Sequence, residues 1–301
     1  MQAIEDLKVG LDVAGPPDSG GEKQAEKDAG DLEEALAFFR SRLFESPGRY
    51  VLDYLTVKRG YTRHEIEGME LGFFPQRQDV KSVLGEGLFE TLGLDTIKGF
   101  GRTHKTIIPY RDHGGRLKGF IARRIDSNRP KYIYSMNVER DALFNLHAVK
   151  NVDAVYVTEG YFDALIATQR GISGVVSTGF AALTERMLED LMNRGIKSIT
   201  LVPDNDMAGL RGAAASLELV REKSVEAFVL ELPEHYKDLD EFMRHEGVKA
   251  FEKLAGQVKA AENWEVQTLL NRRSNIKVRI KSADKTRTAH TYYISRDNQN
   301  R

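Results

Sequence analysis

The stretch that decides the fold runs from Val155 to Asp240 and contains three acidic signatures. They are Glu159-Gly160-Tyr161-Phe162-Asp163, Pro203-Asp204-Asn205-Asp206-Met207-Ala208-Gly209 and Asp238-Leu239-Asp240. Each signature follows, directly or within a few residues, a short apolar run that is typical of a buried strand. Helical patterns separate these runs, and a parallel crossover between strands needs a connection of that size. The stretch is therefore expected to form a parallel α/β sheet.

The predicted strands and helices alternate along this stretch. Strands are expected at 154–157, 174–178, 199–202 and 227–230, and helices near 161–171, 183–194 and 208–222. In open parallel sheets, ligands bind outside the carboxyl ends of the strands. The acidic signatures stand just past strand ends, so their carboxylates should converge on one edge of the sheet.

A cluster of five or six carboxylates needs a counter-charge, because like charges at close range raise each other's pKa. Oxygen ligands without Cys or His favour Mg²⁺ or Mn²⁺, and such ions support phosphodiester formation or cleavage. The candidate metal ligands are Glu159, Asp163, Asp204, Asp206, Asp238 and Asp240. Three of them, Glu159, Asp204 and Asp206, are also the candidate catalytic residues. Glu159 is expected nearest the chemistry, as a metal ligand or as a general base on the attacking hydroxyl.

Together the three signatures resemble the TOPRIM domain, which topoisomerases, primases and some nucleases share. The detail is most similar to bacterial DnaG-type primases. The resemblance continues upstream through Ile107-Ile108-Pro109-Tyr110-Arg111-Asp112, Gly114-Gly115-Arg116-Leu117-Lys118-Gly119-Phe120 and Pro130-Lys131-Tyr132, and it covers about residues 35–255. It implies synthesis of short RNA primers from ribonucleoside triphosphates on a single-stranded DNA template, with more than one Mg²⁺ or Mn²⁺ ion.

Basic side chains are concentrated in the part of the chain that precedes the acidic stretch. Arginine and lysine are natural contacts for the phosphates of nucleic acid or of an incoming nucleotide. With the resemblance, this assigns nucleotide or DNA binding to Arg111, Arg116, Arg123, Lys131 and Arg140.

The charge of the chain is strongly segregated, although the net charge is only −1. It is −7 over residues 1–34, +7 over 35–150, −7 over 151–256 and +6 over 257–301. A basic segment beside a carboxylate-rich one favours a groove for a polyanion next to a metal site.

The predicted fold class is α/β, with a mixed α+β basic subdomain followed by a Rossmann-like parallel-sheet TOPRIM domain. Four segments are expected: a disordered acidic tail or linker at 1–31, the basic subdomain at 32–150, the TOPRIM domain at 151–256, and a helix with a basic tail or hairpin at 257–301. The first segment is rich in Gly, Pro and charged residues and cannot bury enough apolar surface to offset its ordering entropy.

The chain has no cysteine, which excludes a thiolate zinc site within it. The resemblance therefore implies a polymerase core without the family's zinc-binding module. A replicative helicase or a zinc-module protein acting in trans are the partners it suggests. No apolar run approaches the 18 or so residues of a membrane span, and the N-terminus lacks a signal-peptide core, so a cytoplasmic location without membrane contact is expected.

Two other functions use the same residues. A TOPRIM nuclease would cut nucleic acid with these carboxylates, although the basic region similar to the primase core argues against it. A non-catalytic nucleic-acid-binding module is the second alternative, and the acids at all three strand ends argue against that.

Overall fold

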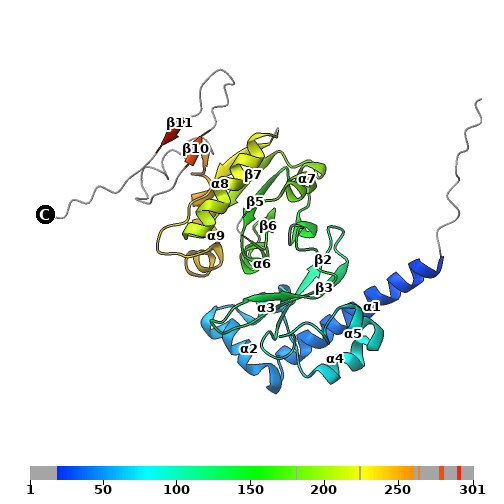
Figure 1. Cartoon of the computed structure of the whole chain (residues 1–301). Helices are drawn as coiled ribbons and strands as arrows, with labels where there is room; N and C mark the ends of the chain where they lie inside the picture. Colours follow the sequence, from blue (N-terminus) through cyan, green and yellow to red (C-terminus); the bar gives the residue numbers. More distant parts are fainter. Residues whose placement is uncertain are drawn as a thin grey trace, which may run out of the picture.

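The structure is a computed structural model that describes residues 19–180, 182–223 and 225–260, together with Trp264 and residues 278–280 and 290–292. Two sheets of different construction organise it (Figure 1). The N-terminal sheet has the strand order β1-β2-β3-β4, and the second sheet has the order β6-β5-β7-β8-β9. The predicted α/β class, with a mixed subdomain before a parallel sheet, is confirmed.

Helices enclose the first sheet. They are α1 (Ser19–Leu43), the 3₁₀ turn η1 (Ser46–Gly48), α2 (Arg49–Asp53), the π-helical turn η2 (Tyr54–Lys58), α3 (Arg63–Gly68), α4 (Arg77–Leu84) and α5 (Glu86–Thr91). The start of α3 is fixed by a capping box, in which Thr62 and Glu65 each bind the other's backbone N–H. The ring of Phe39 on α1 is fully buried, with its centroid 5.3 Å from that of Phe74 and 5.1 Å from that of Phe120.

Helix α1 starts earlier than predicted. Residues 19–31, which were expected to belong to a disordered tail, continue the helix toward the N-terminus. They are rich in Glu, Lys and Ala, which have high helix propensity, and the helix needs no buried face there once Leu32 and Leu36 anchor its other half. Residues 1–18 of the predicted tail lie outside the described residues.

The first sheet is antiparallel and carries the predicted hairpin. Its strands are β1 (Gly72–Phe73), β2 (Thr106–Arg111), β3 (Leu117–Arg123) and β4 (Tyr132–Tyr134). At the turn between β2 and β3, Asp112 Oδ1 accepts hydrogen bonds from the backbone N–H groups of Gly114 (2.9 Å) and Arg116 (3.0 Å). This side-chain turn explains why the hairpin is readable from the sequence.

The second sheet contains four parallel strands and one antiparallel edge strand. The strands are β5 (Ala154–Thr158), β6 (Val175–Ser177), β7 (Ser198–Val202), β8 (Glu226–Val229) and the antiparallel β9 (Lys259–Ala260). Its helices are α6 (Tyr161–Gln169), α7 (Glu185–Asn193), α8 (Met207–Arg221) and α9 (Leu239–Ala255), and the 3₁₀ turn η3 (Leu146–Ala148) precedes it. Every strand and helix predicted in this stretch is found within a few residues of its expected place.

The two parts of the chain share one hydrophobic cluster. The ring of Tyr161, at the start of α6, lies 5.0 Å from the ring of Tyr132 and 4.9 Å from that of Phe144. The next residue, Phe162, stacks on Tyr61 at 5.8 Å. One of the three hydrophobic clusters therefore spans the boundary expected between residues 150 and 151, while each sheet also has a cluster of its own.

The C-terminal predictions are only partly within the described residues. Strands β10 (Val278–Ile280) and β11 (His290–Tyr292) pair antiparallel, as the hairpin interpretation expects. The helix predicted from after Phe251 through Trp264 to Leu270 is interrupted, because α9 ends at Ala255 and β9 occupies Lys259–Ala260. Farther along, the structure describes Trp264, which is buried and donates its Nε1–H to Glu231 Oε1 at 3.0 Å. Among the described helices, none has the length and apolar character to cross a membrane.

Phe39→Ala should destabilise the protein by about 3–5 kcal/mol, because it removes a large buried ring and leaves a cavity. Chemical denaturation followed by circular dichroism measures the change. The control is Val57→Ala, since Val57 is 79% exposed and its loss should change stability by less than about 0.5 kcal/mol. Equal effects of the two substitutions would contradict the packing described for α1.

Candidate active site

The acidic signatures meet at the carboxyl edge of the second sheet. Strands β5 and β7 are parallel neighbours, and their last residues, Thr158 and Val202, are paired across the ladder. The backbone that leaves both strands at this edge carries Glu159 from β5 and Asp204 from β7. This register places the first two signatures side by side, as predicted from the strand ends.

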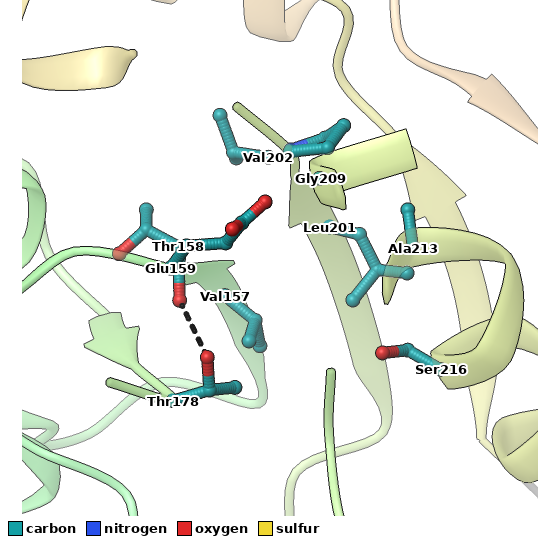
Figure 2. Close-up of a pocket in the computed structure, with 10 residues that line it drawn as sticks. Val157, Thr158, Glu159, Thr178, Leu201, Val202, Gly209, Ala213 and Ser216 are labelled. Carbon is teal, nitrogen blue, oxygen red and sulfur yellow. Dashed lines mark hydrogen bonds between the residues drawn. The ribbon is translucent and has the colours of Figure 1, made fainter. Parts of the chain in front are cut away.

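Glu159 is held close to the loop that follows β7. Its Oε1 accepts the backbone N–H of Asp204 at 3.1 Å, and its backbone carbonyl accepts the hydroxyl of Ser177 at 2.9 Å. In Figure 2 its side chain extends from the end of β5 toward Val202 and Gly209. A methyl group at position 209 would stand 2.5 Å from Glu159 Oε1 and 2.4 Å from the carbonyl oxygen of Asp204. Gly209 is therefore required for the helix to approach these oxygens.

Burial, and then the charges of Asp204 and Asp206, raise the pKa of Glu159 to about 7. Burial also raises the pKa of Asp204, against the opposing effect of Lys237. Carboxyl groups with raised pKa values that face one another are suited to a divalent cation, which would relieve their repulsion.

Lys237 supplies a positive charge between two of the signatures. Its Nζ lies 3.0 Å from Asp204 Oδ2 and 3.6 Å from Asp238 Oδ2. Burial acts to lower the pKa of Lys237, but the charges of Asp204 and Asp238 outweigh it and raise that pKa. Lys237 links the second and third signatures without any metal.

Two of the acids are helix caps. Asp206 begins α8, and its Oδ1 accepts the backbone N–H groups of Ala208 (2.9 Å) and Gly209 (3.0 Å). Asp238 begins α9 and accepts the N–H of Glu241 at 2.9 Å. Each cap uses one oxygen in these bonds and leaves the other to interact beyond its own helix.

Asp163 and Asp240 are buried and are bound by protein groups. Asp163 accepts the N–H of Gly160 at 3.0 Å through Oδ2 and that of Asp240 at 2.7 Å through Oδ1. Asp240 is 2% exposed and binds Arg59 and Tyr61, with Arg244 at 3.4 Å. Burial raises the pKa of both carboxyls, while Arg59 and Arg244 act to lower that of Asp240.

The six predicted ligands therefore divide into two sets. Glu159, Asp204 and Asp206 interact with one another, and Asp238 joins them through Lys237. Asp163 and Asp240 are occupied by backbone amides and by Arg59. Within residues 19–180, 182–223 and 225–260, no three such groups stand ready to hold an ion without rearrangement.

A cluster of cations and aromatic rings adjoins the acidic edge. Arg59 lies over the ring of Phe162, with 4.6 Å from its guanidinium carbon to the centroid, and Arg123 lies over the same ring at 5.0 Å. Both guanidinium groups donate to the hydroxyl of Tyr54, Arg59 through Nε at 2.8 Å and Arg123 through Nη2 at 2.9 Å. The π-helical turn at Tyr54–Lys58 ends immediately before Arg59, whose N–H donates to the carbonyl of Tyr54 at 3.1 Å.

Lys131 belongs to this cluster. Burial, followed by the charges of Arg123, Arg59 and Lys237, lowers its pKa to about 8. Its ammonium lies 5.5 Å from the centroid of Tyr132. Arg140 stands farther along the aromatic surface, 4.9 Å from the centroid of Tyr134.

The remaining two basic candidates lie apart from this cluster. Arg111 is 14% exposed and is paired with Glu33 and Glu70, so its guanidinium is already occupied. Arg116 is 78% exposed on the hairpin turn and lies 3.4 Å from Asp112. The structure thus places Lys131 near Asp238, buries Arg123 among the rings of Tyr54, Tyr132 and Phe162, and leaves Arg111 and Arg116 in other surroundings.

Two residues of the site were not singled out from the sequence. Lys237 directly precedes Asp238, and a lysine beside an acidic signature was a signal that could have been used. Arg59 follows a helix whose aromatic residues were predicted to belong to the hydrophobic core. Its ion-pair partner, Asp240, is 181 positions away in the sequence, so the local sequence around Arg59 does not indicate the pair.

Comparison with known proteins agrees with this geometry. A family model described as Toprim-like matches residues 156–243. The DNA primase of Geobacillus stearothermophilus is 30% identical over 228 residues, which is 69% of this chain and 38% of the relative. The chain therefore spans less than half of the length of this curated relative.

Solved structures show the same architecture. A DNA primase domain from Pseudomonas aeruginosa superposes with a TM-score of 0.70 at 26% identity, covering 81% of this chain and 83% of that one. A DnaG primase catalytic domain bound to single-stranded DNA has a TM-score of 0.67 at 23% identity, covering 84% and 88%. The second likeness is evidence for the fold alone.

The pKa of Glu159 predicts how the metal-free protein responds to pH. Because this carboxyl ionises near pH 7 when folded but near its ordinary value of ~4.3 when unfolded, folding stability should fall as pH rises between these values. Glu159→Gln removes this loss, so its Tm advantage over the unmodified protein should be larger at about pH 7.5 than at about pH 5. Thermal melts of both proteins in EDTA at the two pH values measure this difference in Tm.

Glu226→Gln is the control, since Glu226 is exposed and lies at the opposite edge of the same sheet. Its Tm difference should not depend on pH over this range. A Tm difference for Glu159→Gln that is equal at both pH values would contradict the environment described for this carboxyl.

Proposed function

Because the chain is a homologue of bacterial DnaG-type primases across their catalytic core, we propose that it synthesises short RNA on a single-stranded DNA template. The observation that carries the proposal is that the basic cluster adjoins the acidic signatures: Arg59 pairs with Asp240, and the charge of Asp238 acts on Lys131. The reaction joins the 3′-hydroxyl oxygen of one nucleotide to the α-phosphorus of the next. The bond between the α- and β-phosphates breaks, and pyrophosphate leaves with its electron pair.

Toprim primases are metal-dependent, and the residues at this edge fit such ions. We infer that Glu159, Asp204, Asp206 and Asp238 hold Mg²⁺ or Mn²⁺, because they are hard oxygen donors with an excess of negative charge. Bound there, the ions supply charge that stabilises the phosphoryl oxygens as the bond is formed. The absence of a side chain at Gly209 lets the start of α8 lie directly against the oxygens of Glu159 and Asp204. Asp163 and Asp240 would have to exchange their present partners to join the set.

Glu159 is the proposed acceptor for the proton of the attacking hydroxyl. A carboxylate at this strand end can accept a proton from a hydroxyl within hydrogen-bond reach, and a bound cation would keep it ionised by lowering its raised pKa. The hydrogen bond from the backbone of Asp204 orients one of its oxygens and leaves the other for this role. Asp204 and Asp206 position the reacting groups from the neighbouring strand end.

The template and the nucleotide are proposed to lie along the cation and aromatic cluster. Lys131 is exposed and offers positive charge toward phosphates, and the rings of Tyr132 and Tyr134 lie beside it and Arg140. Arg123 is buried and donates to the hydroxyls of Tyr54 and Tyr132, so its proposed part is to hold these rings in place. The solved DnaG catalytic domain that is bound to single-stranded DNA shares this fold, which supports the choice of template. The ribonucleoside triphosphates, a replicative helicase and a zinc-module protein in trans stay predictions from the family resemblance.

One gel tests the function. The protein is incubated with single-stranded DNA, labelled ribonucleotides and Mg²⁺ or Mn²⁺, and the products are examined for short RNA and for cut DNA. RNA that depends on template and metal supports the proposal. Cut DNA without RNA would instead indicate the TOPRIM nuclease alternative.

Glu159→Gln should abolish RNA synthesis, with a loss of at least about 10²-fold, because it removes both a ligand charge and the proton acceptor. Its fold and its binding to single-stranded DNA should be nearly unchanged. Glu226→Gln, the same chemical change at the opposite sheet edge, should leave synthesis intact. Normal synthesis by folded Glu159→Gln protein would rule out the assigned role.

Lys131→Ala should weaken binding to single-stranded DNA and reduce the slope of log K against log [salt] by about 0.7, the value for one phosphate contact. Fluorescence anisotropy at several salt concentrations measures the slope. Lys197→Ala is the matched control, because Lys197 is exposed and pairs with Asp153 at the far end of the sheet. An unchanged slope in Lys131→Ala would remove this residue from the binding surface.

A further inference from the structure

Lys237 has a side chain and a backbone that are held in different ways. Its backbone N–H donates to Glu241 Oε2 at 2.7 Å, and its carbonyl accepts the N–H of Asn205 at 2.7 Å. Asn205 Nδ2 also donates to the carbonyl of Tyr236 at 2.7 Å. Hydrogen bonds therefore hold the backbone at position 237 to helix α9 on one side and to the segment that follows β7 on the other.

The side chain of Lys237, by contrast, is 57% exposed and ends between two carboxylates. Its ammonium group contacts Asp204 at 3.0 Å and Asp238 at 3.6 Å. A four-carbon stem with solvent on one side can swing outward while the fastened backbone stays in place. Leaving this position requires no change in the loop.

The charges at this edge indicate when the side chain of Lys237 would move outward. Glu159, Asp204, Asp206 and Asp238 carry up to four negative charges, and a divalent ion among them brings at least as much positive charge as two lysines. The ammonium group of Lys237 and a divalent ion would repel each other if both bound the carboxylate of Asp204. Binding of the ion therefore weakens the ion pair between Lys237 and Asp204. The ammonium group of Lys237 lies between Asp204 and Asp238, so it takes up space that an ion bound to both carboxylates would need.

We propose that Lys237 is the resident counter-cation of the acidic edge. It holds Asp204 and Asp238 together in the metal-free protein, and a divalent ion displaces it. This inference rests on the proposed metal-dependent function, and it adds that the chain carries its own competitor for the metal. Lys237 is in this sense a positioning residue, because it preserves the spacing of two ligands until the ion arrives.

The test is Mn²⁺ binding to the full chain, measured by electron paramagnetic resonance without nucleotide or DNA. Lys237→Met removes the competitor and should tighten Mn²⁺ binding about fivefold, the effect expected of one half-exposed ion pair. In EDTA the same variant should have a lower Tm, because its carboxylates lose their counter-charge. Lys197→Met, which removes a lysine paired with Asp153 at the other end of the sheet, should change neither quantity.

A second measurement uses the unmodified protein and does not depend on how a variant folds. Acetylation of lysines with and without Mn²⁺, quantified by mass spectrometry, should show Lys237 becoming several-fold more reactive when the ion binds, with Lys197 unchanged. Weaker Mn²⁺ binding by Lys237→Met, or no change in the labelling of Lys237, would overturn the inference while leaving the metal site intact. Absence of Mn²⁺ binding by the unmodified protein would overturn the metal site as well.

Discussion

Repulsion between carboxylates at one sheet edge is the constraint on which the rest of this structure depends. The parallel register of β5 and β7 brings Glu159 and Asp204 together, and the starts of α8 and α9 add Asp206 and Asp238. The protein tolerates this by giving each acid a local partner. Backbone amides at helix starts take some of the charge, and Lys237 takes part of the rest. Hydrogen bonds and Lys237 thus offset part of the repulsion within the protein itself.

The two buried acids, Asp163 and Asp240, connect elements of the fold. Asp163 accepts the backbone N–H of Asp240 and so joins the start of α6 to the start of α9. Asp240 in turn binds Arg59, which comes from the first subdomain and lies over Phe162. A contact between a phosphate and Arg59 would therefore compete with the bond to Asp240. This chain of contacts links the first subdomain to the starts of α6 and α9.

The aromatic residues at the start of α6 explain why the two sheets act as one unit. Tyr161 and Phe162 directly follow the first acidic signature, and both rings are buried against the N-terminal subdomain. Burial of two large rings offers several kcal/mol of apolar stabilisation, on the order of 1.5–3 kcal/mol each. The same short segment thus carries Glu159 and Asp163 and packs against the N-terminal subdomain beside them.

The parallel sheet, the succession of its strands and helices, the hairpin and the acidic edge could all be predicted from the sequence, because they depend on local patterns and on the direction of each strand. The turn at Asp112 and the capping box at Thr62 are local hydrogen-bond arrangements of the same kind. The ion pairs between distant residues, in contrast, follow from the tertiary structure. Arg59 and Asp240 are far apart in the chain, and Arg111 is paired with Glu33 and Glu70 from other elements. Those pairings depend on how helices pack across the two sheets, since a side chain's charge partner is set by distance in space and not by spacing in the sequence.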